Sequence, residues 1–196
     1  MTREESISLS ARISAEIARS APKITYTLDE LAEAKACFGE EDLAEMRSLG
    51  LYDGDFEKFY VFREFLSELD LGVDLDGAYI LRLFEEARKL DAKEFCDDPY
   101  MAILSSSPAR QGNCMLMPSV YEAGEIFCYD APNFKREIVA PRLAFFTKRV
   151  VFPTLYEGKT PWMSVCPSEI NSMREAIDAA RGRVLVLGLG LGKYKI

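Results

Sequence analysis

Three glycines near the end of the chain have the spacing of a ligand-binding loop. Gly188, Gly190 and Gly192 follow directly on the apolar run Val184–Leu187. Because glycine has no Cβ, such a segment bends sharply and approaches a ligand closely, and the amides that open a following helix bind anionic groups. The dinucleotide pattern Gly-x-Gly-x-x-Gly requires another glycine where Lys193 stands. The spacing therefore predicts a cofactor loop of a different type.

The segment around these glycines resembles motif I of class I S-adenosylmethionine-dependent methyltransferases. The resemblance starts at Pro161–Ser164, continues through a helix and ends with Gly182–Gly192. The segment is similar to that of uncharacterised bacterial enzymes and relatives of spermidine synthase. It implies that Gly188, Gly190 and Gly192 pass under the amino-acid part of S-adenosylmethionine, in the first strand-turn of a Rossmann-like domain.

Two departures limit what the resemblance implies for this chain. Val186 stands where many members of the family have an acidic residue, two positions before the first glycine. Only Lys193–Ile196 follows the glycines, whereas the family continues with a helix, a second strand with a ribose-binding carboxylate and an adenine pocket. We therefore expect S-adenosylmethionine to bind only where that domain is complete, and this chain alone to bind no cofactor and to be catalytically silent. The catalytic residues and the small-molecule substrate stay open.

Trp162 is the only tryptophan of the chain. It lies at the start of the segment that resembles the methyltransferases, which makes it a candidate substrate-binding residue. The other interpretation is a buried core ring, because tryptophan contributes a large apolar area to a core.

The composition excludes several kinds of chemistry. The chain has no histidine, which removes the commonest general base, the commonest transition-metal ligand and every Ser-His-Asp or Cys-His arrangement. Its five cysteines are odd in number and far apart, with no Cys-x-x-Cys pair, so neither a disulfide framework nor a metal site is expected.

Charge and hydropathy restrict the partners. The net charge is −8, and nowhere do more than two Lys or Arg stand side by side, which argues against nucleic acid. Residues 1–21 lack the continuous apolar core of a signal peptide, and the longest apolar run, 184–192, is too short to cross a bilayer. We expect a cytoplasmic protein with no membrane partner.

The apolar pattern predicts an α+β fold in three parts. Residues 1–98 have helical spacing and predict a helical bundle, whose phenylalanine stripe Phe56, Phe59, Phe62 and Phe65 is expected in the core. Residues 99–165 predict a small antiparallel β-region, and residues 166–196 the first helix and strand of a truncated Rossmann-like α/β domain. The expected strands are Tyr100–Leu104, Cys114–Met117, Glu125–Tyr129, Leu143–Phe146 and Val150–Leu155, with 157–161 as a loop.

Individual boundaries follow from turn and cap residues. Thr27 is expected to cap a helix, and the fifth helix is expected to run from Ala78 to Leu90. Ser168 is expected to cap the last helix, and Gly182 to end it.

A second interpretation of the C-terminal segment is a strand with a flexible glycine tail. In that case the strand completes the chain's own sheet or pairs with a second copy, because an unpaired apolar edge invites association. The chain would then be a non-catalytic binding or interaction protein, and pairing with a second copy through that strand would make it a homo-oligomer.

Overall fold

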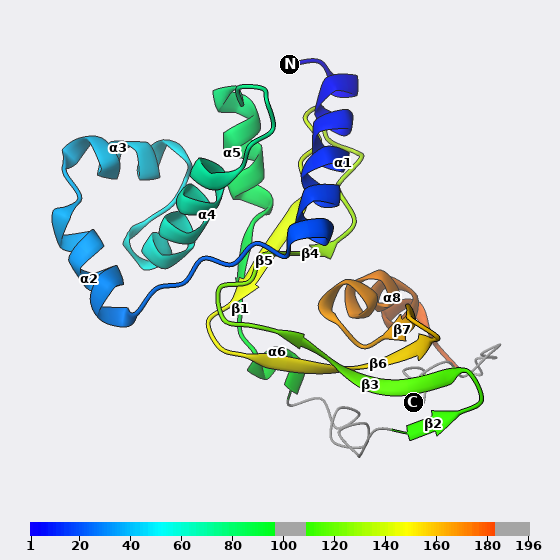
Figure 1. Cartoon of the computed structure of the whole chain (residues 1–196). Coiled ribbons are helices and arrows are strands. Elements are labelled where there is room, and N and C mark those ends of the chain that lie inside the picture. Colours follow the sequence, from blue (N-terminus) through cyan, green and yellow to red (C-terminus); the bar gives the residue numbers. More distant parts are fainter. Residues whose placement is uncertain (97–108, 183–196) are drawn as a thin grey trace.

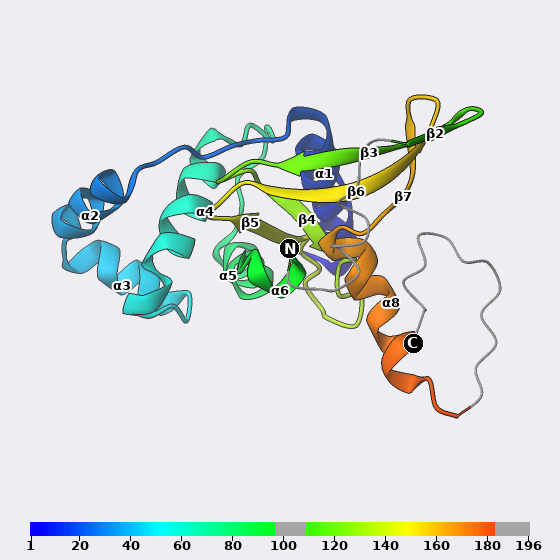
Figure 2. The ribbon, with the colours of Figure 1, turned by 90° about the horizontal axis from the view of Figure 1, so that it is seen from below.

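The computed structural model describes residues 1–96 and 109–182. Within these ranges the chain forms seven α-helices and two small sheets, which confirms a mixed α+β fold (Figure 1). Helices α2 (Leu28–Cys37) and α3 (Glu40–Ser48) lie at one end of the molecule. The long antiparallel pair of β3 (Cys114–Tyr121) and β6 (Val150–Glu157) extends to the opposite end (Figures 1 and 2). The apolar run and the glycines of the predicted Rossmann-like strand lie outside the described residues.

The helices begin where the sequence supplies caps. Thr2 and Thr27 each accept the amide of a glutamate three residues on, and each glutamate accepts the threonine's own amide. These two reciprocal pairs satisfy amides that have no partner within the helix, and Thr27 confirms the predicted cap. The helices are α1 (Arg3–Ser20), α2 (Leu28–Cys37), α3 (Glu40–Ser48), α4 (Phe56–Glu68, preceded by the 3-10 turn Asp53–Asp55), α5 (Gly77–Glu86), α6 (Lys93–Cys96) and α8 (Pro167–Ala179).

The strands form one sheet of three strands and one of four. The smaller sheet has the order β1-β5-β4 and the larger β2-β3-β6-β7. All pairs are antiparallel except β1 with β5. The strands are β1 (Arg88–Leu90), β2 (Ala109–Gln111), β3 (Cys114–Tyr121), β4 (Phe127–Asp130), β5 (Arg142–Phe146), β6 (Val150–Glu157) and β7 (Thr160–Ser164).

Three boundaries differ from those expected. Helix α5 ends at Glu86, and Arg88–Leu90 becomes a strand because its backbone pairs in parallel with β5, a partner far along the sequence. The expected loop over 157–161 is a tight turn at Gly158 followed by edge strand β7, where Pro161 is tolerated. Cys166, not Ser168, occupies the N-cap of α8, because its carbonyl accepts the first intrahelical bond, from Ile170.

Strand β5 is buried on both faces and so belongs to two cores. Leu143 and Phe145 join the core beneath the helices, where the expected phenylalanine stripe of α4 is almost fully buried. Ala144 and Phe146 join a second core between the larger sheet and α8. The regions expected at 1–98 and 99–165 therefore pack around a shared strand, which explains the apolar run of β5 at consecutive positions.

A partly buried ionic network ties α5 to the smaller sheet. Arg142 of β5 donates to Glu86 at 2.9 Å and also pairs with Asp130 of β4. The Tyr129 hydroxyl donates to the Glu86 carbonyl at 3.0 Å, and Asn171 of α8 donates to the Tyr129 carbonyl at 3.1 Å. Glu86 is only 8% exposed, and its charge is balanced by Arg142 together with Arg82 of its own helix, which lies 3.4 Å away.

The two sheets meet at one corner, which the linker between α1 and α2 crosses. The connection β3–β4 and the turn β5–β6 both pass between the sheets there. The Gly124 amide donates to the Phe146 carbonyl at 2.8 Å, and the Gly124 carbonyl accepts the Ile24 amide at 3.0 Å. The Ile126 amide donates to the Pro22 carbonyl at 2.8 Å. Segments about a hundred residues apart are thus joined by their backbones.

Gly124 is required at this corner. It has φ +75°, and a Cβ there would lie 2.0 Å from the Ile24 carbonyl oxygen. We predict that Gly124→Ala lowers the free energy of unfolding by about 3 kcal/mol or more, from left-handed strain plus overlap. Gly112→Ala is the matched control, because Gly112 has φ +60° and open space around it, and it should cost about 1 kcal/mol. If urea unfolding showed equal losses of unfolding free energy for Gly124→Ala and Gly112→Ala, the steric argument would be contradicted.

Candidate functional site

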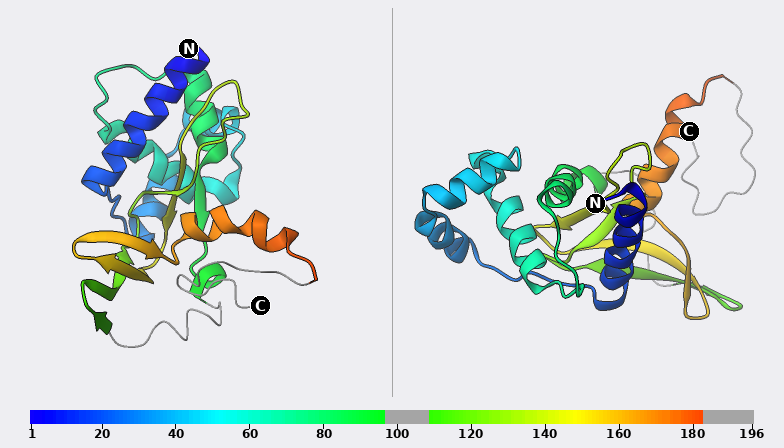
Figure 3. Two further views of the ribbon diagram at one scale, coloured as in Figure 1. Left: turned by 90° about the vertical axis from the view of Figure 1, so that its right-hand side faces the viewer. Right: turned by 90° about the horizontal axis from the view of Figure 1, so that it is seen from above.

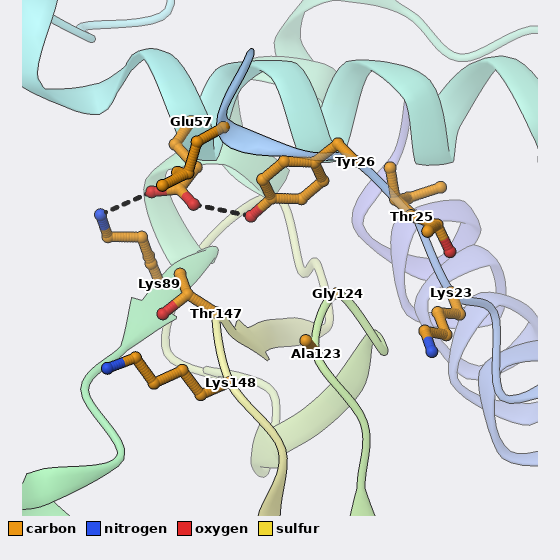
Figure 4. Close-up of a pocket in the computed structure, with 11 residues that line it drawn as sticks. Lys23, Thr25, Tyr26, Glu57, Lys89, Ala123, Gly124, Thr147 and Lys148 are labelled. Atoms are coloured by element: carbon orange, nitrogen blue, oxygen red, sulfur yellow. Dashed lines mark hydrogen bonds and ion pairs between the residues drawn. The ribbon is translucent and has the colours of Figure 1, made fainter. Parts of the chain in front are cut away.

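A cleft of about 410 Å³ opens at the corner where the sheets meet (Figure 4). The α1–α2 linker, α4, β1, the β3–β4 connection and the β5–β6 turn all contribute to its wall. The lining residues are Lys23, Ile24, Thr25, Tyr26, Leu28, Glu57, Lys89, Ala123, Gly124, Thr147 and Lys148. Its size lies within the range of about 300–1,000 Å³ that is usual for small-molecule sites.

Glu57 of α4 is the carboxylate of the cleft. Its Oε1 accepts the Tyr26 hydroxyl at 2.7 Å, and its Oε2 accepts the Lys89 ammonium at 2.9 Å (Figure 4). The side chain is 17% exposed, so the carboxylate is held at the edge of solvent with both oxygens engaged. This geometry fixes Tyr26 and Lys89 on one wall.

Tyr26 stays protonated under ordinary conditions. Burial, together with the hydrogen bond to Glu57, raises the pKa of its hydroxyl well above its usual value near 10. Its ring packs edge-to-face on Tyr60 with centroids 5.8 Å apart. With Tyr26 neutral and Glu57 fully hydrogen-bonded, these groups suit binding and positioning better than proton transfer.

The cleft is positively charged although the protein is acidic. Three lysines and one glutamate line it, so its side chains carry a net charge of +2. Lys23 stands on one side, and Lys89 and Lys148 on the other, with Thr147 between the latter two (Figure 4). Among residues 1–96 and 109–182, only Lys89 of these lysines forms an ion pair.

The residues singled out from the sequence are not brought together here. Gly188, Gly190 and Gly192 lie outside the described residues. Trp162 is 65% exposed on edge strand β7, so the alternative of a core ring is wrong, and it is not among the residues that line the cleft. Its role in substrate binding stays a prediction.

Sequence reasoning missed the cleft residues because they come from five separate segments. Lys23, Glu57 and Lys148 lie far apart in the sequence, and none of them belongs to a recognisable motif. Gly124 was the one available signal, since a glycine between two strand patterns marks a turn or a close backbone approach.

The described part of the chain contains no group of three or more His, Cys, Asp or Glu side chains positioned to hold a metal ion. Among its helices, none combines the length and hydropathy needed to cross a bilayer. Comparison of the chain with protein-family models, with curated proteins and with solved structures finds no match.

The Tyr26–Glu57 hydrogen bond should contribute measurably to stability. We predict that Tyr26→Phe lowers the free energy of unfolding by about 1.5 kcal/mol, the usual value for a hydrogen bond to a charged group. Tyr60→Phe is the control, because the Tyr60 hydroxyl makes no hydrogen bond within the described residues, and it should change little.

The same pair gives a dependence on pH. Because the folded state raises the Tyr26 pKa, the contribution of its hydroxyl is complete below the unfolded value near 10 and declines as pH rises above it. Urea unfolding of the parent and of Tyr26→Phe should therefore converge above pH 10. A difference that grows with pH would contradict this sign.

Proposed function

We propose that this chain is the substrate-side part of an S-adenosylmethionine-dependent methyltransferase-like protein in the cytoplasm. The observation that carries the proposal is the order of elements at the C-terminal side. Helix α8 ends at Ala179, Gly182 follows with φ +66°, and the apolar run and the spaced glycines come next. The methyltransferase family that this segment resembles begins its cofactor domain in the same order, with a helix, a glycine turn, a buried strand and a glycine loop.

The placement of α8 is consistent with this proposal. Its first turn is anchored, because Cys166 and Ile170 belong to the second core and Asn171 bonds to β4. Its last residues extend away from the sheets (Figure 3), and Arg174 and Asp178 are exposed. A cofactor domain that continues the chain would therefore start from the outer end of α8.

The cleft itself does not fit S-adenosylmethionine. That cofactor supplies an electrophilic methyl group on a positively charged sulfur, and the cleft already has a net charge of +2 with its single carboxylate engaged. We therefore assign the cofactor to Gly188, Gly190 and Gly192 with the further elements of the family. The part of this chain before them would position a substrate and exclude water, the usual sources of rate in such a transfer.

A second candidate is a non-catalytic interaction protein that associates through the C-terminal strand. It is favoured by β7, which within residues 1–96 and 109–182 is an edge strand of the larger sheet with Trp162 exposed. Such an edge with an exposed aromatic ring offers a surface for another strand.

Deletion of residues 183–196 separates the two candidates. Under the methyltransferase proposal the remaining chain keeps its thermal midpoint and its oligomeric state, because that segment belongs to the cofactor domain. Under the interaction proposal the deletion lowers the midpoint or changes the oligomeric state. Thermal unfolding and light scattering of the parent and the deletion variant measure both.

Two further observations address methyl transfer itself. Calorimetric titration of this chain with S-adenosylmethionine should show no saturable binding, and sub-millimolar binding would contradict the assignment of the site to additional elements. The native reading frame should continue past the codon for Ile196, and the residues it encodes should show the patterns of alternating strands and helices. A stop codon at that point would overturn the proposal.

A further inference from the structure

Two of the three lysines of the cleft form no ion pair in the described part of the chain. Lys89 is balanced by Glu57, whereas Lys23 and Lys148 face no carboxylate within ion-pair distance there. In a protein with a net charge of −8, two such cations beside one cleft are a local excess of positive charge. Such an excess in a concave site raises the local concentration of anions.

The walls that carry these lysines are fixed before any ligand arrives. Lys23 precedes Ile24, whose amide is bonded to Gly124, and Lys148 lies in the turn just after Phe146, whose carbonyl accepts the Gly124 amide. Lys89 lies in β1, opposite Phe145 of β5. All three side chains therefore extend from one rigid corner, and only their flexible stems need to be ordered on binding, which limits the entropic cost.

Hydroxyl and apolar groups complete the cleft. Thr25 and Thr147 are exposed at the cleft beside Lys23 and Lys148, and each hydroxyl is a hydrogen-bond donor. The Tyr26 ring and the exposed Leu28 side chain supply apolar surface for an organic group. Lysine is a common phosphate binder that acts as a point charge.

We propose that this cleft binds a small organic phosphate. Its net charge of +2 matches a phosphate dianion, its volume of about 410 Å³ admits a molecule of the size of a sugar phosphate, and its hydroxyls donate to phosphate oxygens. The inference is independent of methyl transfer, because none of the lining residues belongs to the glycine segment.

Glu57 controls how much of the positive charge is available. In the free protein its carboxylate holds the Lys89 ammonium at 2.9 Å and competes with any anion. Replacing it with glutamine removes the competing charge, keeps an acceptor for Tyr26 and releases Lys89. Glu57→Gln therefore binds the phosphate more tightly, an effect that a purely structural role of Glu57 would not produce.

The test is calorimetric titration with ribose 5-phosphate, with ribose and succinate as comparison ligands. The parent is expected to bind ribose 5-phosphate saturably, ribose not at all, and succinate more weakly. The double variant Lys23→Gln/Lys148→Gln should bind ribose 5-phosphate at least tenfold more weakly, and Glu57→Gln should bind it severalfold more tightly. The control is the double variant Lys135→Gln/Lys159→Gln, which loses the same charge outside the cleft lining and should keep the parent's affinity.

Several outcomes would overturn the proposal. These are no saturable binding by the folded parent, equal binding of succinate, and equal weakening by the two double variants. The lysines replaced in both double variants are exposed, so these variants should keep the fold, and circular dichroism verifies it. Weaker binding can then be distinguished from loss of structure. Failure of this test leaves the methyltransferase proposal standing, because that proposal is tested by the deletion and by the reading frame.

Discussion

The structure depends on one backbone contact, the close approach of Ile24 to Gly124. The linker between α1 and α2 lies so near the β3–β4 connection that no side chain fits at position 124. Hydrogen bonds on both sides of this contact join the linker to the connection, and the connection to the end of β5. Because buried backbone groups must be paired, this arrangement also satisfies polar atoms at the corner between the sheets.

The rest of the architecture follows from that corner and from β5. Strand β5 has a core on each face, so the helices pack on one face and the larger sheet on the other. The ion pair of Arg142, the first residue of β5, with Glu86 holds α5 against the strand. The cleft follows from the geometry of this corner. Three segments that meet at a rigid corner leave a concavity, and the residues next to the joined backbones, Lys23 and Lys148 among them, line it.

Sequence patterns predicted the local elements and missed the long-range ones. The Thr27 cap, the phenylalanine stripe of α4 and the strands around Cys114, Leu143 and Val150 depend on neighbouring residues, and all are present. Strand β1 was missed because its partner is β5, and β7 because a glycine turn and a proline at an edge resemble a loop. Apart from the glycine at position 124, the cleft has no sequence signature, since its charge arises from side chains brought together only by the tertiary fold.

The most direct test of this account is amide hydrogen exchange at Ile24, Gly124 and Ile126. If the linker is locked to the β3–β4 connection, these amides exchange only on global unfolding, as slowly as those in the centre of β5. Exchange as fast as in the exposed loop around Lys135 would contradict the central claim, because the corner would then be open and the cleft not formed in advance.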